Sequence, residues 1–155
     1  MMIPLSFNVI KALNGRTLVT AESCTGGGIG AELTAVPGSS AVYKGGIISY
    51  TNEVKTKMLG VDPEILQTEG AVSEKVAIAM AEGVRKVLSA DISVSVTGLA
   101  GPSGDEFNNP VGTVFIGYSD VERTVCESYL FIGSRNAVRQ QAIDAALQMI
   151  LKFNQ

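Results

Sequence analysis

At residues 17–28 the chain reads Thr17-Leu18-Val19-Thr20-Ala21-Glu22-Ser23-Cys24-Thr25-Gly26-Gly27-Gly28, an apolar run that passes directly into a polar, glycine-rich turn. Residues 17–21 are rich in β-branched and aliphatic side chains, which predicts a strand. The apolar residues 29–36 that follow the glycines are predicted to form a helix, which ends at the Pro37-Gly38 breaker. This stretch therefore indicates a strand, a tight turn and a helix in succession.

The rest of the chain shows the same mixture of strand and helix patterns, without long-period repeats. Helices are expected at 3–13 and after the capping residues Thr51, Asp62, Ser73 and Ser134. Strands are expected at 46–50, 92–97, 112–119 and 123–131. This order predicts an α/β fold, namely a single domain over residues 1–155 that forms a three-layer α/β/α sandwich with a mixed, mostly parallel sheet.

The composition excludes several kinds of chemistry. The chain contains no histidine, which rules out Ser-His-Asp and Cys-His pairs, His-Glu-x-x-His zinc sites and any histidine base. Two cysteines, Cys24 and Cys126, are too few for a disulfide scaffold, so a reducing compartment is expected. The formal charge is −3 without a basic block, so no nucleic-acid partner is expected. No apolar run approaches the roughly 18 residues of a membrane span, so a cytoplasmic protein without a membrane partner is expected.

The surface is expected to be unusually apolar. Charged residues make up 17% of the chain, below the roughly 25% that is typical of soluble domains. The mean hydropathy is positive, at +0.26. A subunit interface would cover the surplus apolar surface, so the composition predicts a homo-oligomer.

Three segments with small or polar residues follow predicted strands, at 22–28, 50–55 and 97–104. In open α/β sheets, ligands bind beyond the carboxyl ends of the strands. We therefore expect these three segments to converge on one site.

The first segment contains a candidate nucleophile, Ser23. It precedes glycines 26–28, whose N–H groups at a helix start would suit an oxyanion or a phosphate. An N-cap role for Ser23 or Thr25 would explain the same residues equally well. Cys24 is an alternative nucleophile, because a helix N-terminus lowers the pKa of a thiol, and it could equally be a small buried apolar residue.

A serine nucleophile in a chain without histidine needs another base, and a neutral lysine can serve as one. Lys55 is the candidate because it follows a predicted strand, although a lysine in such a position is more commonly a solvated helix residue. The pair Tyr50 and Lys55 also suggests a short-chain dehydrogenase. Four residues separate the two instead of three, and the glycine-rich segment lacks the Gly-x-Gly-x-x-Gly pattern, which excludes that class.

Several motifs occur in a fixed order along nearly the whole chain, at 20–27 (TAESCTGG), 38–40, 45–55, 69–73, 97–102 and 110–114. Together they resemble the C-terminal domain of the competence/damage-inducible CinA family, which is the nicotinamide-nucleotide amidase, or NMN deamidase. The resemblance implies hydrolysis of the carboxamide of nicotinamide mononucleotide (NMN) to nicotinate mononucleotide and ammonia, in bacterial pyridine-nucleotide salvage. It implies a small-molecule nucleotide as substrate, no cofactor and no metal.

The resemblance also implies roles for individual residues. Ser23 is the nucleophile by matched position, and Lys55 and Tyr50 belong to the network that removes its proton. Thr97 positions that network or the substrate. Arg139 is the charged residue of the site, with Arg135, one turn earlier on the same helix, as the alternative.

Glycines complete the site that the resemblance implies. The N–H groups of Gly26 and Gly27 are expected to bind an oxyanion or phosphate, and Gly101 in the second glycine-rich loop is expected to contact the substrate. That loop departs from the family pattern, which has a lysine before the proline at 110, whereas this chain has Asn109, with Asp105 and Glu106 nearby. The departure predicts weaker phosphate binding or a different substrate. It leaves open a non-catalytic nucleotide-binding or regulatory module, or an amidase for another small amide.

Overall fold

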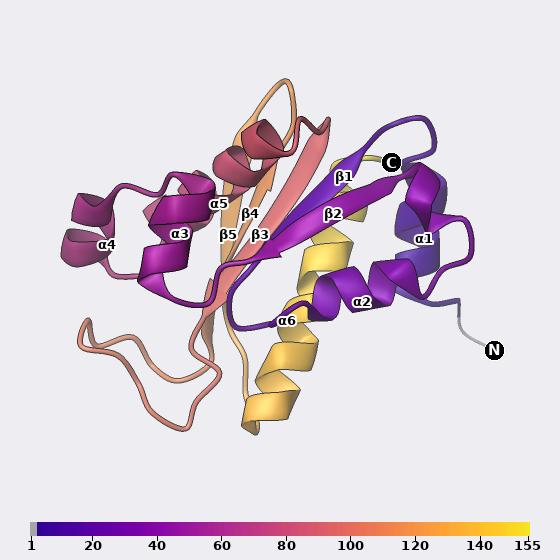
Figure 1. Ribbon diagram of the computed structural model, residues 1–155. Helices are drawn as coiled ribbons and strands as arrows, with labels where there is room; N and C mark the ends of the chain where they lie inside the picture. Colours follow the sequence, from indigo (N-terminus) through magenta and orange to yellow (C-terminus); the bar gives the residue numbers. More distant parts are fainter. Residues whose placement is uncertain (1–2) are drawn as a thin grey trace.

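The computed structural model describes residues 3–155 (Figure 1). Along the chain lie α1 (Leu5–Ala12), β1 (Leu18–Glu22), α2 (Gly28–Thr34), a 3-10 turn (Ser39–Ala41), β2 (Tyr43–Ile48), α3 (Asn52–Leu59), α4 (Pro63–Glu69), α5 (Glu74–Val87), β3 (Ile92–Gly98), β4 (Thr113–Ser119), β5 (Thr124–Leu130) and α6 (Arg135–Lys152). In α3 to α6, the side chain of the residue before the helix accepts a backbone N–H from its first turn. These N-caps are the four predicted ones, Thr51, Asp62, Ser73 and Ser134.

The strands form one mixed sheet in the order β2-β1-β3-β4-β5. Strands β2 and β3 both pair with β1 in parallel, whereas β4 pairs antiparallel with β3 and with β5. All the strands except β4 therefore run in one direction. This arrangement confirms the predicted α/β fold with a mixed sheet.

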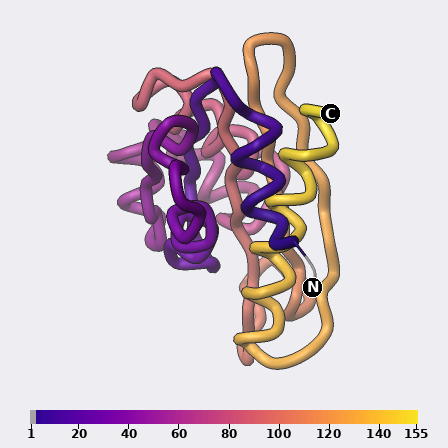
Figure 2. The backbone as a smooth tube through the Cα atoms, turned by 90° about the vertical axis from the view of Figure 1, so that its right-hand side faces the viewer, coloured from indigo at the N-terminus to yellow at the C-terminus, as the bar shows by residue number. Residues whose placement is uncertain are grey.

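Helices cover both faces of the sheet, which gives the three predicted layers. Figure 2 shows α1 and α6 on one side of the strands and the segment from α3 to α5 on the other. Helix α2 packs with α1 and α6, and α3 and α4 pack against α5. Within residues 3–155, no helix combines the length and the apolar character needed to cross a membrane.

Strand β1 lies between two apolar cores, because successive side chains of a strand point to opposite faces. Leu18 packs in the core under α1, α2 and α6, and Val19 and Ala21 pack in the core under α5. The same alternation places Thr20 and Glu22 on the Leu18 face. The chain therefore leaves β1 with a carboxylate on the α2 side of the sheet.

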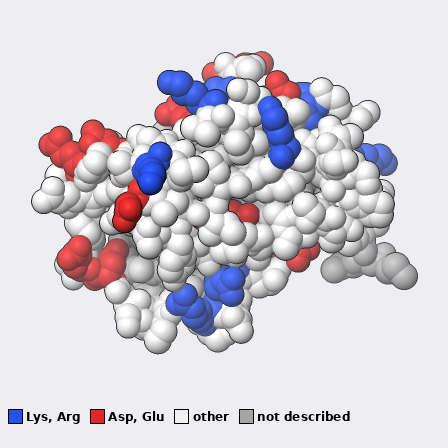
Figure 3. Space-filling view, in the orientation of Figure 1, with Lys and Arg blue, Asp and Glu red and all other residues white. Residues whose placement is uncertain are grey.

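The parallel strands β1, β2 and β3 end at the same edge of the sheet. The segments that follow them are the ones expected to converge, and they lie together at this edge, near the start of α6 (Figure 1). The face shown in Figure 3 has several acidic side chains around α3 and α4, with a cationic side chain among them, and cationic side chains over the N-terminal end of α6. The site described next lies between these two groups of charges.

Candidate active site

Ser23 occupies the first position after β1, at the start of a tight turn. Its N–H donates to the carbonyl of Val96 over 3.0 Å, which continues the pairing of β1 with β3. Its own carbonyl accepts the N–H of Gly26 over 3.1 Å. Gly26 and Gly27 have φ angles of +61° and +99°, a backbone conformation that residues other than glycine rarely adopt. The serine is therefore held at the strand end by backbone geometry on both sides.

Lys55 reaches Ser23 from the second turn of α3. Its side chain is 1% exposed, so it is not the solvated helix residue considered as the alternative. Its Nζ lies 3.0 Å from Ser23 Oγ and donates to the carbonyls of Ser49 (2.8 Å) and Tyr50 (3.2 Å). Besides its bond to carbon, the amine nitrogen has three bonding directions. Two of them point to carbonyl oxygens, and the third points to the serine hydroxyl.

The environment of Lys55 favours the neutral amine. Burial lowers its pKa from 10.5 to about 8, and Cys24 opposes this shift only as a secondary influence. At this pKa about a tenth of the lysine is neutral at pH 7, whereas at a pKa of 10.5 less than about a thousandth would be. A neutral Nζ has a lone pair in the direction of Ser23 Oγ, which is the arrangement that a general base requires.

Cys24 is a poor candidate for the nucleophile. Its side chain is 6% exposed. Burial raises the pKa of its thiol to about 11, although Arg139 and Lys55 act in the opposite direction. Because the thiolate is the reactive form, Cys24 stays unreactive near neutral pH. Its position fits the small buried residue that was the alternative interpretation.

A cavity of about 420 Å³ opens beside the Ser23–Lys55 pair. It is built from the ends of β1 and β3, the start of α3, the loop before α5 and the start of α6. Its lining consists of Ser23, Cys24, Tyr50, Asn52, Lys55, Ala71, Val72, Thr97, Gly98, Leu99, Ala100, Gly101, Pro102, Ser103 and Arg135. The cavity therefore includes five of the eight residues proposed from the sequence. It does not include Gly26, Gly27 or Arg139.

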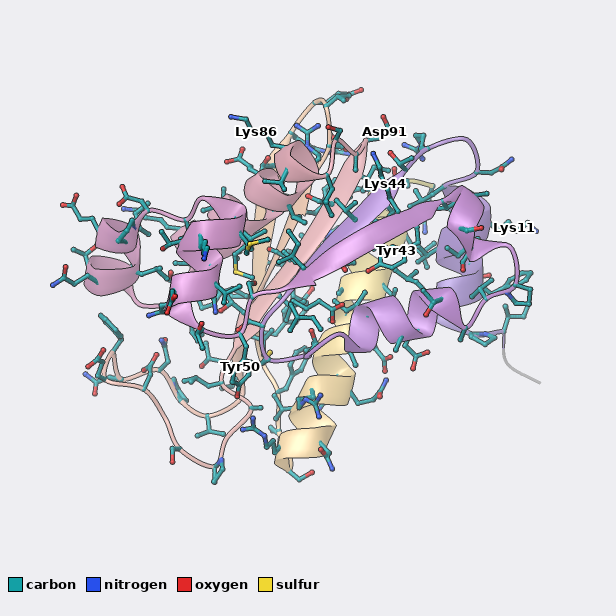
Figure 4. All side chains as sticks on the ribbon, in the orientation of Figure 1. Lys11, Tyr43, Lys44, Tyr50, Lys86 and Asp91 are labelled. Atoms are coloured by element: carbon teal, nitrogen blue, oxygen red, sulfur yellow. The ribbon has the colours of Figure 1, made fainter. Side chains whose placement is uncertain are left out.

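Arg135 is the arginine that lines the cavity. Its Nη1 donates to the carbonyl of Gly101 over 2.6 Å, and its Nη2 donates to the hydroxyl of Tyr50 over 3.1 Å. Tyr50 is 58% exposed and lies in the segment that connects β2 to α3 (Figure 4). Tyr50 thus contacts Lys55 through its backbone carbonyl, while its phenol binds Arg135 at the rim of the cavity.

Arg139 lies behind the serine turn. Its Nε donates to the carbonyl of Cys24 over 2.9 Å, and its Nη2 donates to the carbonyl of Thr25 over 3.2 Å. These bonds attach the turn after β1 to α6. Arg139 therefore supports the turn, whereas Arg135 faces the space in which a substrate would bind.

Thr97 is buried at the end of β3 and lines the cavity. Its hydroxyl donates to the carbonyl of Ala71 over 2.7 Å. This bond joins the strand end to the loop before α5. Thr97 therefore shapes the wall of the cavity, with its hydroxyl directed to that loop.

Glu22 is a feature of the site that the reasoning from sequence missed. Its side chain is 2% exposed and lies directly before Ser23. Its Oε1 accepts the Thr25 hydroxyl (2.7 Å) and the Ile29 N–H (2.9 Å), and its Oε2 accepts the Gly30 N–H (3.0 Å). The chain's own carboxylate therefore occupies the start of α2, where an external anion was expected. The available signal was an acidic residue at the end of an otherwise apolar strand, since buried carboxylates are rare without partners.

The sequence model of the CinA C-terminal domain matches residues 4–154 of this chain. The chain belongs to the CinA family. It is 50% identical over 131 residues to a CinA-like protein of Synechocystis sp., which covers 83% of this chain and 32% of that protein. It is 46% identical over 138 residues to a CinA-like protein of Acidobacterium capsulatum, which covers 89% of this chain and 33% of that protein. The chain thus spans about a third of the length of these curated relatives.

Solved structures give the same result. The crystal structure of the competence/damage inducible protein CihA from Agrobacterium tumefaciens superposes with a TM-score of 0.94 at 36% identity, over 100% of this chain and 99% of that chain. A CinA superfamily protein from Escherichia coli superposes with a TM-score of 0.94 at 34% identity, over 96% of this chain and 88% of that chain. These similarities confirm the resemblance to the CinA family and the α/β sandwich.

The loop at 103–110, where this CinA-family chain departs from the expected pattern, is organised by Asp105. Its Oδ1 accepts the N–H groups of Phe107 (3.1 Å) and Asn109 (3.0 Å). Asn109 Nδ2 donates to Asp105 Oδ2 (2.8 Å) and to the carbonyl of Val72 (3.2 Å). The residue in place of the expected lysine therefore attaches the loop to the cavity wall. Asp105 and Glu106 are not among the residues that line the cavity.

Proposed function

We propose that this CinA-family chain is an amidohydrolase that hydrolyses the carboxamide of nicotinamide mononucleotide to nicotinate mononucleotide and ammonia. The observation that carries the proposal is the approach of Lys55 Nζ to 3.0 Å from Ser23 Oγ at the wall of a cavity. A buried lysine whose pKa is lowered towards neutrality can replace histidine as the base of a serine nucleophile.

The reaction begins with proton transfer from the Ser23 hydroxyl to the neutral Lys55 amine. Ser23 Oγ then forms a bond to the carboxamide carbon, and the carbonyl oxygen becomes an oxyanion. The Lys55 ammonium returns its proton to the amide nitrogen as the C–N bond breaks, and ammonia leaves. Water then attacks the ester and gives a proton to Lys55, which passes it to Ser23 Oγ as the ester C–O bond breaks. The acid product loses its remaining proton to solvent, so the carboxylate, the free serine and the neutral lysine are restored. General base catalysis of this kind contributes about 10²- to 10⁴-fold in rate.

The oxyanion needs a backbone donor next to the nucleophile. The N–H of Gly26 is bonded to the carbonyl of Ser23, and the N–H groups of Ile29 and Gly30 are bonded to Glu22. Cys24 lines the cavity and directly follows the nucleophile, the position that supplies an oxyanion donor in other serine hydrolases. We therefore assign this role to the N–H of Cys24.

The nucleotide part of the substrate needs a cation at the other end of the cavity. Arg135 is exposed and lines the cavity, and its guanidinium is suited to a phosphate because it offers several donors in one plane. In the proposed complex, the carboxamide lies at Ser23 and the phosphate lies at Arg135. The family membership supports this substrate class through the resemblance stated above.

A panel of compounds tests the proposal. The protein is incubated with NMN, other nicotinamide nucleotides and small amides, and both ammonia release and binding are measured. Ammonia release from NMN that disappears in Ser23→Ala is the expected result, because the nucleophile is lost. Undiminished turnover in that variant would exclude Ser23 as the nucleophile.

A second candidate function is a nucleotide-binding or regulatory module without catalysis. The observation in its favour is Asn109, which stands in place of the lysine of the family pattern and is bonded to the cavity wall. Binding of NMN without ammonia release would support this module. Ammonia release only from a compound that is not a nucleotide would instead indicate an amidase for another small amide.

A further inference from the structure

Glu22 is a buried charged group that the proposed reaction does not use. It lies one residue before the nucleophile, and the alternation along β1 directs it towards α2, while the Ser23 hydroxyl is directed towards α3. Removing a carboxylate from water is costly unless hydrogen bonds replace the lost hydration. The neighbouring N–H and O–H groups meet that requirement here, so the carboxylate and its donors form one connected unit.

The donors to Glu22 lie within the serine turn and directly after it. Thr25 is inside the turn, and Ile29 and Gly30 are in the first turn of α2. The carboxylate therefore ties the end of β1 to the first turn of α2, and these bonds close residues 23–30 into a loop. A change in the position of Glu22 would move the backbone that carries Ser23.

Arg139 binds the same turn from its other side. Arg139 donates to the carbonyl groups of Cys24 and Thr25, whereas Glu22 accepts the hydroxyl of Thr25 and the N–H groups that follow. The anion thus binds donors and the cation binds acceptors of a single turn. The two side chains therefore hold the turn through different polar groups.

A chain of hydroxyl groups connects Glu22 to the edge of the sheet. Thr20 Oγ1 lies 3.4 Å from Glu22 Oε2 and 2.7 Å from the hydroxyl of Tyr43. Tyr43 belongs to β2 and lies between this strand and α2 (Figure 4). The carboxylate is therefore restrained from the strand side as well as from the helix side.

We propose that Glu22 is a positioning residue, whose carboxylate holds the serine turn so that Ser23 Oγ stays within reach of Lys55 Nζ. This role rests on the proposed function only in taking Ser23 as the nucleophile. Because Glu22 already occupies the start of α2, a phosphate group of the substrate is excluded from that place. The effect of Glu22 is then on the chemical step and not on substrate affinity.

Thr25 gives the sharpest test, because its hydroxyl binds Glu22 and its side chain is buried. Thr25→Val keeps the shape and removes the hydroxyl, whereas Thr25→Ser keeps the hydroxyl. We expect kcat for NMN to fall by about 10- to 100-fold in Thr25→Val with KM unchanged, since a small displacement of a reacting group has effects of this size. Thr25→Ser is expected to recover most of the loss.

Glu22→Gln tests the carboxylate itself, because an amide nitrogen would face the N–H of Ile29 or Gly30. A kcat loss with KM unchanged is expected, while the midpoint of the pH profile stays near 8, because Lys55 and its carbonyl partners are unaltered. The matched control is Glu32→Gln, which makes the same change of charge on α2 without affecting the turn. It is expected to leave kcat and KM unchanged.

Labelling of Ser23 separates a failure of this inference from a failure of the proposed function. The probe is phenylmethylsulfonyl fluoride, and intact mass reports the rate of addition even if NMN is not the substrate. Slower labelling in Thr25→Val than in Thr25→Ser and Glu32→Gln supports the inference. Equal labelling, or variants that differ from the wild type only in melting temperature, would overturn it. A rise in KM for NMN at unchanged kcat would also overturn it, because it would assign the start of α2 to the phosphate.

Discussion

Lys55 is unusual as a single residue because it is a lysine buried among backbone carbonyls without a carboxylate partner. Its Nζ is bonded to Ser49 and Tyr50, which are neutral acceptors. Such contacts satisfy the N–H groups without the strong stabilisation of the charged form that an aspartate or glutamate would give. The site therefore lowers the pKa of the amine and increases the share of the neutral form, which is the form that a base needs.

The pH dependence of activity follows from this environment. The active form of Lys55 is neutral, so kcat/KM for NMN is expected to rise with pH and to level off above a midpoint near 8. The measurement is initial ammonia release between pH 6 and about 9.5, the upper limit being below the usual pKa of lysine. Activity that falls as the pH rises towards 8 would contradict a lysine base. Lys55→Arg keeps a positive charge that is not lost in this range, so its activity is expected to be almost absent at every pH.

The same residue makes stability depend on pH. The pKa of Lys55 is about 8 in the folded chain and 10.5 in the unfolded chain, so between these pH values the unfolded chain binds more protons. The contribution of Lys55 to the free energy of unfolding therefore becomes more favourable as the pH rises. The shift corresponds to a cost of about 3 kcal/mol at and below neutral pH. Lys55→Met removes this dependence. Urea unfolding of both proteins at several pH values is expected to show the wild type gaining relative to Lys55→Met between pH 8 and 10.5. A constant difference would contradict the lowered pKa.

Among the elements, α6 carries two arginines with different tasks although they are one turn apart. Arg135 in its first turn faces the cavity, and Arg139 in the next turn binds the carbonyls of the serine turn. Sequence spacing alone puts both on one face of the helix. The position of each guanidinium relative to the ends of β1 and β2 decides which of them can meet a ligand.

Substitution of the two arginines should separate these tasks. Arg135→Gln is expected to raise KM for NMN by about 10-fold or more with a smaller change in kcat, because a charge-assisted contact to phosphate is worth about 1.5–3 kcal/mol. Arg139→Gln is expected to lower kcat, because the turn that carries Ser23 loses its anchor. Steady-state kinetics with NMN and with a small amide that lacks phosphate provide the check. An equal loss for both amides in Arg135→Gln would contradict a phosphate contact.

The helix α1 illustrates a limit of periodicity at the level of elements. The apolar spacing of Ile3, Phe7, Ile10 and Leu13 predicts a helix, and α1 forms there. Leu13 is buried together with Ser6 and Val9, whereas Phe7 is 45% exposed. Periodicity identifies the helix, but packing against α2 and α6 selects the side that is buried.

At the scale of the whole molecule, exposed apolar side chains remain on the surface. Val121, Leu130 and Ile132, in and after the β4–β5 hairpin, are 77%, 63% and 86% exposed. Together with the low charged fraction, they support the proposal that the chain forms a homo-oligomer.

Sedimentation measures the oligomeric state directly. We expect a species larger than the 16.2 kDa monomer. Ile132→Glu is expected to shift the population towards the monomer, because a charge would be buried at the interface. The exposed Val87, on α5, provides a control position, at which Val87→Glu is expected to leave the assembly unchanged. A monodisperse wild-type monomer would contradict the proposal.

The sequence by itself determined the elements of the fold and the residues from which a serine–lysine site could be built. Apolar periodicity and capping residues act over a few neighbouring positions, so they specify strands, helices and N-caps locally. The glycine-rich turn after β1 marked Ser23, and the lack of histidine restricted the base to another residue type. The resemblance to the family motifs pointed to Lys55 as the base and to a nicotinamide nucleotide as the expected substrate.

Only the tertiary structure decided how these residues are placed relative to one another. Burial of Lys55 against the carbonyls that follow β2 lowers its pKa, and the placement of α6 directs Arg135, not Arg139, to the cavity. Glu22 occupies the start of α2, so the glycine turn holds the chain's own carboxylate. Each of these outcomes depends on desolvation and hydrogen bonds between segments far apart in the chain. Local sequence patterns contain no information about such contacts, and folding alone brings them together.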